Sequence, residues 1–346
     1  MISPSELFSR IAVARSTGTE ANRSVRADLV EALKDRGFTV QEQEFPAAPD
    51  SLDAVQMAGR FLAGGAVVAL ALARIPVVAD LTAIFTLLLV VGLGVYLAYA
   101  ANRAPRKVAT GVNLIGRKGS GLPAVWLMAH YDTKSQRLSM AGRIGALAIA
   151  VLGAAGLLAF SATQTVVASA LALPALVGGL LLARCATGND SPGALDNATA
   201  LVAVLDILDQ APNARVGVAF TDAEEWGLLG ARHLAGSRPD LFGGRPVINF
   251  DGLDDRGQTI LFAHRPGPLT MRLRDKLKAR VRRRLPVLVD GVAMAPVAGE
   301  CVTVMRGNWA CARIVHTPRD ARGRLTLTGA NAVASAVAAV LSVTAR

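Results

Sequence analysis

The 346-residue chain is apolar and basic: 52% of its residues are hydrophobic, 18% are charged, and its formal net charge is +11 at pH 7. This composition excludes a purely soluble protein, so part of the chain is expected to lie in lipid. Aromatic residues make up only 5%, and no zinc-finger or RNP-like pattern is present, so the basic charge does not indicate nucleic-acid binding. Basic residues beside anionic lipid headgroups account for it better.

Residues 1–56 are predicted to be soluble. A first helix is capped by Ser3 or Ser5, and a second helix covers Glu20–Arg36 and stops at Gly37. The alternating residues 38–45 then predict a strand. The first 16 residues lack the apolar core and the cleavage site of a signal peptide, so we expect none.

Two long apolar segments, 57–102 and 144–183, interrupt the soluble sequence. In the first, Phe61–Ala79 contains only Arg74 as a charge and Leu81–Ala101 contains none, with a turn expected near Pro76 and Asp80. In the second, the polar residues 161–165 divide an uncharged stretch into two spans. Each segment therefore predicts a transmembrane helical hairpin. The alternative is a set of buried helices in a large soluble core, but four such runs in two pairs favour the membrane.

The charges that flank these hairpins predict the topology. Two hairpins return the chain to one side, so the soluble segments 1–56, 103–143 and 184–346 share a compartment. That side carries most of the flanking basic residues, namely Arg60, Arg103, Arg106, Lys107, Lys134, Arg137, Arg143 and Arg184, whereas the opposite turns offer only Arg74. The positive-inside rule predicts a multi-pass plasma-membrane protein with its soluble segments in the cytoplasm.

The soluble segments show an α/β rhythm. Apolar runs at 124–129, 216–220, 246–250 and 259–263 predict buried strands, and helical patterns cover Asn197–Leu208, the stretch after Gly230 and the residues from Gly329 onward. The basic stretch 271–286 carries an i, i+4 leucine and valine stripe, which predicts a helix packed on the sheet. The expected fold is a mostly parallel mixed sheet flanked by helices.

Polar residues follow three of the predicted strands directly. The first strand runs into His130 and Asp132, the second into Asp222, Glu224 and Glu225, and the third into Asp251. Because ligands bind at the carboxyl ends of parallel strands, these side chains should converge. A loop with Asp196 and an apolar run ending in His316 add two further candidates.

Taken singly, these residues have ordinary explanations. Asp222 is a candidate helix cap, an isolated Glu224–Glu225 pair is usually a solvated surface pair, and a lone histidine is more often structural than a ligand. His233 and His264 have no acidic neighbour in a matching pattern, so both are predicted to be structural.

The ordered set H-x-D, G-A-L-D-N, E-E-W-G-L-L-G, N-F-D-G and V-H-T-P resembles the di-zinc aminopeptidase family. This family includes bacterial leucyl aminopeptidases, glutamate carboxypeptidase and glutaminyl cyclase. The resemblance covers most of the soluble sequence and implies a zinc-exopeptidase-like fold. One difference is Gly299-Glu300-Cys301, which stands where relatives often show a Ser-Asp pair near the substrate pocket.

The resemblance implies a role for each residue in two Zn²⁺ sites. Asp196 would bridge the two ions, and Glu224 would be the general base. The remaining ligands would be Glu225 and His316 on one ion and His130 and Asp251 on the other, with Asp132 orienting His130.

The chemistry of the residues agrees with these implied roles. A short carboxylate such as Asp196 suits two ions about 3.5–4 Å apart. Nitrogen and oxygen ligands without thiolate favour a catalytic over a structural zinc site. Adjacent acids in a loop point in different directions, so Glu225 can bind metal while Glu224 moves a proton.

The predicted function is a zinc-dependent exopeptidase that acts on peptides, with aminopeptidase action preferred. Carboxypeptidase or dipeptidase action, a one-zinc enzyme like glutaminyl cyclase, and a non-catalytic binding relative are the alternatives. The presence of His130 and Asp251 argues against one zinc, and the complete ligand set argues against a binding relative. The apolar spans argue against a transporter, which needs polar groups within them.

Overall fold

The computed structural model describes residues 2–75, 77, 81–103, 108–163, 166–283 and 288–344. The chain divides into two compact units. The first, here the α/β unit, comprises Met1–Ala48, Lys107–Ser135 and Gly188–Arg346. The second, here the helical unit, comprises Pro49–Arg106 and Gln136–Thr187. The predicted turn at Pro76 and Asp80 lies outside the described residues, as do Gln164 and Thr165 of the second predicted turn.

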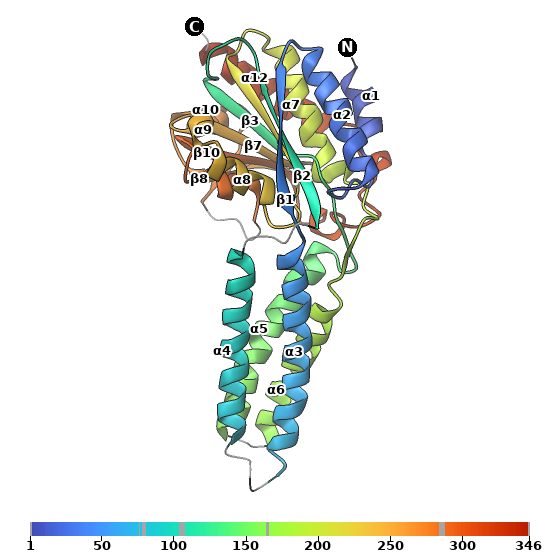
Figure 1. Cartoon of the computed structure of the whole chain (residues 1–346), viewed down its shortest axis with the longest axis vertical. Coiled ribbons are helices and arrows are strands. Elements are labelled where there is room, and N and C mark those ends of the chain that lie inside the picture. Colours follow the sequence, from blue (N-terminus) through green and yellow to red (C-terminus); the bar gives the residue numbers. More distant parts are fainter. Residues whose placement is uncertain are drawn as a thin grey trace. The chain divides into compact units, whose positions relative to one another are not determined.

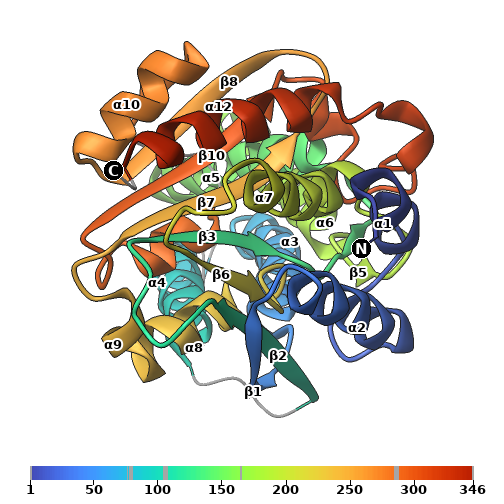
Figure 2. The same cartoon turned by 90° about the horizontal axis from the view of Figure 1, so that it is seen from above.

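The α/β unit contains an eight-stranded mixed sheet in the order β1-β2-β6-β3-β7-β10-β8-β9 (Figures 1 and 2). The central strands β6, β3, β7 and β10 are parallel, whereas β1, β2 and β8 each pair antiparallel with a neighbour. The strands are β1 Thr39–Ala47, β2 Ala109–Arg117, β3 Val125–His130, β6 Val216–Thr221, β7 Pro246–Leu253, β8 Gln258–Arg265, β9 Arg280–Arg282 and β10 Glu300–Gly307. The predicted fold class is therefore confirmed.

Helices cover both faces of this sheet, which is why β3 and β6 are buried along their whole length. One core joins the sheet to α1 (Pro4–Ile11), α2 (Glu20–Lys34), α7 (Thr199–Gln210), α10 (Pro268–Leu277) and α12 (Thr328–Thr344). A second core on the opposite face includes residues of α8 (Leu229–Ser237), α9 (Pro239–Phe242) and α11 (Asp290–Met294). Figure 2 shows α7 and α12 on one side of the strands and α8 and α9 on the other.

The predicted helix over residues 271–286 is wrong in its second half. Helix α10 ends at Leu277, because Lys278 adopts a left-handed conformation with φ of 49°. The chain then forms the short edge strand β9, which pairs parallel to β8. Leu269 and Leu273 of the predicted stripe are buried, whereas Val281 is exposed and Leu285 lies outside the described residues.

The helical unit consists of α3 (Asp50–Leu72), α4 (Leu81–Asn102), α5 (Met140–Thr163) and α6 (Val166–Ala183). Helix α3 begins and ends earlier than predicted, so Arg74 follows the helix instead of lying in a span. Within the described residues, three helices are long and apolar enough to cross a membrane: Leu52–Leu72, Leu81–Asn102 and Met140–Thr163. The described apolar part of α6, Ala172–Ala183, is shorter.

Small residues allow close packing inside the helical unit. A Cβ on Gly179 would lie 2.6 Å from the Ala63 nitrogen, and one on Gly153 would lie 2.1 Å from the Ala175 nitrogen. Larger side chains would therefore separate α3 from α6 and α5 from α6. Small residues at helix contacts are typical of bundles in lipid, where packing replaces the hydrophobic effect between helices.

Candidate metal centre

The sheet brings three of the predicted site segments together. Strands β6, β3 and β7 are neighbours, and His130 at the end of β3 pairs with Thr221 at the end of β6. Glu224 and Glu225 follow β6 within a few residues, and Asp251 lies near the end of β7. These residues therefore meet at the carboxyl edge of the parallel strands.

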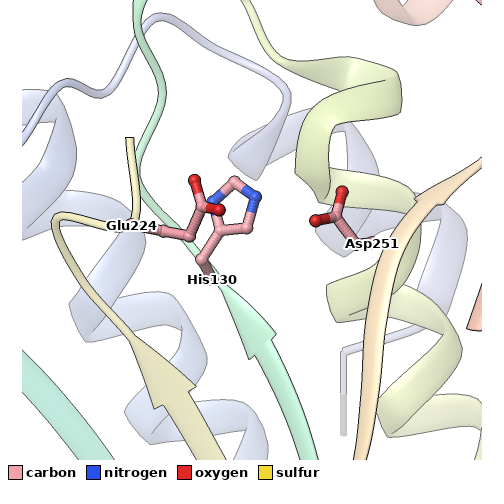
Figure 3. A group of neighbouring side chains, drawn as sticks. All are labelled: His130, Glu224 and Asp251. Atoms are coloured by element: carbon pink, nitrogen blue, oxygen red, sulfur yellow. The ribbon is translucent and has the colours of Figure 1, made fainter. Parts of the chain in front are cut away.

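Two groups of potential metal-ligating atoms lie there, each with its atoms within 4.8 Å of one another. One group is His130, Glu224 and Asp251, whose side chains point toward a common space in Figure 3. The other group is Asp196, Glu225 and His316. All six residues were predicted as site residues from the sequence.

Asp196 connects the two groups. Its Oδ1 lies 3.1 Å from Nε2 of His130, and its Oδ2 lies 3.0 Å from Nε2 of His316. The same His316 nitrogen lies 3.1 Å from Oε1 of Glu225. The two oxygens of one carboxylate thus face histidines from opposite groups, which is the arrangement that a bridging ligand requires.

Asp132 organises both neighbouring loops. Its Oδ1 lies 3.4 Å from Nδ1 of His130, the ring nitrogen that faces away from Asp196. Its carboxylate also accepts the backbone N–H groups of Glu224 and Glu225, each at 3.1 Å. Asp132 therefore holds the two glutamates as well as the histidine for which it was predicted, as supporting carboxylates do around metal ligands.

The backbone of the Asp196 loop is fixed from two sides. The Asp320 carboxylate accepts the N–H groups of Leu195 at 2.7 Å and Asp196 at 3.1 Å. The Asn197 side chain donates to the Phe250 carbonyl at 3.0 Å and accepts from Gly252 at 3.1 Å. These contacts link Asp196 to the His316 loop and to the strand that carries Asp251.

Lys134 corrects one part of the topology prediction. It was counted among the basic residues flanking the membrane, but its ammonium is buried and lies 2.5 Å from Oε2 of Glu225. The charges of His316 and Lys134 outweigh the effect of burial and lower the pKa of Glu225 to about 2. Glu225 therefore stays ionised, with Oε2 held by Lys134 and Oε1 left toward His316.

The site holds more negative charge than its surroundings neutralise. Burial, reinforced by the charge of Asp196, raises the pKa of Asp251 to about 7. Burial and neighbouring carboxylates, with Glu225 the largest of them, raise the pKa of Glu224 well above its usual value. The buried Oε1 of Glu225 faces Nε2 of His316 at 3.1 Å. Clustered buried carboxylates beside two imidazoles fit divalent cations, because bound cations remove this repulsion.

Sequence reasoning missed Asp320 and also missed a second acid beside this cluster, Asp290 at the start of α11. It is buried, accepts a hydrogen bond from Thr221 and is among the charges that raise the pKa of Glu224. Of the stretch Gly299-Glu300-Cys301, which stands where relatives often show a Ser-Asp pair, Glu300 and Cys301 are the first two residues of β10. The Glu300 carboxylate accepts hydrogen bonds at the N-terminus of α10. Its Oε2 accepts the Leu269 N–H at 3.0 Å, and its Oε1 accepts the backbone N–H and the hydroxyl of Thr270.

Asp222, which the sequence left as a candidate helix cap, does not cap a helix. It is buried and accepts hydrogen bonds from five groups on four segments of the chain, the donors being Thr17, Asn22, Val112, Tyr131 and Ala223. His233 stacks on Phe45 with ring centroids 5.4 Å apart, and His264 contacts the Thr303 hydroxyl at 2.9 Å. Neither histidine belongs to the two ligand groups.

Solved structures of several known proteins share the fold of this chain. The chain is similar to a zinc aminopeptidase from Bacillus subtilis at 12% identity and a TM-score of 0.58, over 99% of this chain and 95% of that one. It is similar to a Zn-dependent exopeptidase from Parabacteroides distasonis at 13% identity and a TM-score of 0.58, over 98% of each chain. It is also similar to glutaminyl cyclase from Fimbriiglobus ruber at 13% identity and a TM-score of 0.56, over 99% of this chain and 95% of that one.

These identities are low enough that the similarity establishes the fold alone, and no curated protein matches the sequence. The model of peptidase family M28 matches residues 113–341, a range that contains all six ligand-group residues and Asp132. Because this match covers more than half of the chain, the chain belongs to peptidase family M28.

Proposed function

We propose that this metallopeptidase is a membrane-anchored aminopeptidase that uses two zinc ions. The observation that carries the proposal is the position of Asp196, with one oxygen 3.1 Å from His130 and the other 3.0 Å from His316. A single-metal site needs no carboxylate between two histidines. Asp196, Glu225 and His316 would hold one ion, and Asp196, His130 and Asp251 the other.

Zinc ions held by these residues would lower the pKa of a bound water molecule to near neutral and polarise the carbonyl of the peptide bond. Glu224 accepts the proton of that water and passes it to the leaving amine. Asp132 fixes the direction of Glu224 through the backbone, at 3.1 Å.

The test is metal analysis with product analysis on the purified full-length chain in detergent. We expect two zinc ions per chain, loss of hydrolysis with a chelator, and recovery on adding zinc. Mass spectrometry of a digested peptide library should show products shortened from the N-terminus.

Other outcomes would identify the alternatives. Shortening from the C-terminus would indicate a carboxypeptidase, and cleavage of dipeptides alone a dipeptidase. Loss of ammonia from N-terminal glutamine without shortening would indicate a cyclase, an activity found among the similar structures. Active protein without zinc or a related divalent metal would contradict the proposal altogether.

The exposure pattern of α4 supports the membrane anchor. Among its described residues only Thr82 and Thr86 are buried, while Leu88 is 68% exposed and Val95 is 64% exposed. A helix of a soluble protein shows the opposite pattern, with apolar residues inside. Exposed apolar surface of this extent needs lipid or a partner to cover it.

We propose that the α/β unit is cytoplasmic, and this conclusion does not depend on Lys134. The described flanking residues Arg103, Arg137, Arg143 and Arg184 still give the predicted charge bias. A reporter enzyme that works only in the cytoplasm should be active when fused to the C-terminus. A reporter that works only after export should be inactive there, and the reverse result would place the unit on the other side.

A further inference from the structure

Arg15 is a fully buried cation in the segment between α1 and α2. Its side chain has 0% exposure, and no described carboxylate forms an ion pair with it. Burial lowers its pKa to about 10, against the attraction of nearby acids, with Asp132 the largest contribution, so it stays charged at neutral pH. A buried charge is costly unless its donors are satisfied, and here backbone carbonyls satisfy them.

The guanidinium joins the two loops that carry His130 and Asp196. Its Nε donates to the Tyr131 carbonyl at 2.6 Å, between His130 and Asp132. Its Nη1 donates to Pro192 at 2.8 Å, and its Nη2 donates to Gly193 at 3.2 Å, three residues before Asp196. One rigid planar group therefore sets the separation of two loops that are far apart in the sequence.

The backbone around Arg15 strengthens this link. Its N–H donates to the Thr133 hydroxyl at 2.8 Å, and its carbonyl accepts from Thr133 N–H at 3.3 Å. A Cβ on Gly193 would lie 2.2 Å from the Thr133 side chain and 3.2 Å from Nη1 of Arg15. Gly193 also has φ of 57°, so the loop accepts no larger residue there.

We propose that Arg15 is a positioning residue of the metal centre, which holds the His130 loop and the Asp196 loop at the separation that the His130–Asp251 zinc requires. The inference rests on the two-zinc centre of the proposed function. The other zinc depends less on Arg15, because Glu225 is held by Lys134 and the Asp196 backbone by Asp320.

Charge and geometry predict opposite effects for Arg15→Gln. If Arg15 acted only through its charge, removing a cation near the ligands would tighten both zinc ions. If it acts by fixing the loops, the change weakens the zinc at His130 and Asp251 and leaves the other nearly unchanged. Loss of supporting contacts around metal ligands typically costs about 10–100-fold in affinity.

The experiment is a competition titration of zinc against a chromogenic chelator, with the full-length chain in detergent and thermal unfolding measured in parallel. The matched control is Arg36→Gln, because Arg36 is also buried and forms a bidentate pair with Asp209 at 2.8 and 2.7 Å, at the other end of α7. We expect Arg15→Gln to weaken one zinc step about 10–100-fold. Arg36→Gln should lower the Tm and change neither step.

The titration separates this inference from the proposed function, because it does not use activity. A wild type without two zinc steps contradicts the two-zinc centre itself. If the wild type shows two zinc-binding steps, three results for Arg15→Gln overturn the role of Arg15 alone: both steps become tighter, both become weaker by the same factor, or neither changes. If Arg15→Gln does not fold, Arg15→Lys is titrated in its place, because lysine keeps the positive charge and lacks the planar guanidinium. Weakening of one zinc-binding step alone supports the inference. Two unchanged steps overturn it.

Discussion

Replacing Glu224 with glutamine is expected to reduce kcat by about 10²–10⁴-fold while both zinc ions remain bound. Glutamine has nearly the same shape and still reaches the site, but it does not accept a proton from water. Because a general base acts mainly in the transition state, KM should change little. The measurement is steady-state hydrolysis of a peptide substrate beside metal analysis of the same sample.

Glu225→Ala is the informative partner of this variant, because Glu225 is adjacent and belongs to the other ligand group. It should lose one zinc and leave Lys134 without its ion-pair partner. The oxygen atoms of Glu224 are themselves close enough to His130 and Asp251 to bind a metal. If Glu224→Gln loses a zinc and Glu225→Ala keeps both, the assignment of base and ligand is reversed.

Asp222→Ala is expected to cost about 3 kcal/mol of stability or more without removing any residue of the two ligand groups. Its carboxylate accepts five hydrogen bonds, and each buried donor left without an acceptor costs about 1–3 kcal/mol. We expect a Tm lower by roughly 10 °C in thermal unfolding of the zinc-loaded chain. Asp240→Ala is the control, because its side chain is 63% exposed and pairs with Arg238 at the surface.

The pH dependence of stability distinguishes a buried acid such as Asp222 from an acid in a salt bridge. Burial first, and then the charge of Asp132, raise the pKa of Asp222 to about 6. The native state therefore holds this proton more tightly than the unfolded chain, whose value is about 3.9. The stability from Asp222 is complete below about pH 4 and decreases as the pH rises to about 6. The Tm difference between the wild type and Asp222→Asn should therefore narrow over that range, and a difference that widens would contradict the raised pKa.

Strands β3, β6, β7 and β8 and the polar residues that follow three of them were predictable because both follow from local pattern, whereas β2 and β10 were not predicted. Apolar runs such as 216–220 are typical of strands covered on both faces, and parallel neighbours place residues such as His130 and Asp251 at one edge. The end of helix α10 was predicted wrongly because the apolar stripe in the sequence continues past Lys278. Periodicity does not detect a residue in the left-handed conformation that ends a helix.

The supporting contacts were not predictable, since each joins segments far apart in the chain. Arg15 donates hydrogen bonds to residues that are 116 and 178 positions away in the sequence. Asp320 accepts a hydrogen bond from Asp196, which is 124 positions away. No local signal marks such residues. Lys134 was misassigned for the same reason, because a count of basic residues does not show that one of them is buried against Glu225.

The order of the segments has a consequence for synthesis of the protein. Strand β1 precedes α3 and α4 in the chain, and its partner β2 follows them. His130 precedes α5 and α6, whereas Asp196 and the remaining ligands follow them. A chain growing from its N-terminus therefore completes all four apolar helices before the ribosome has made the second ligand. The two ligand groups can therefore assemble only after all four of these helices have been synthesised.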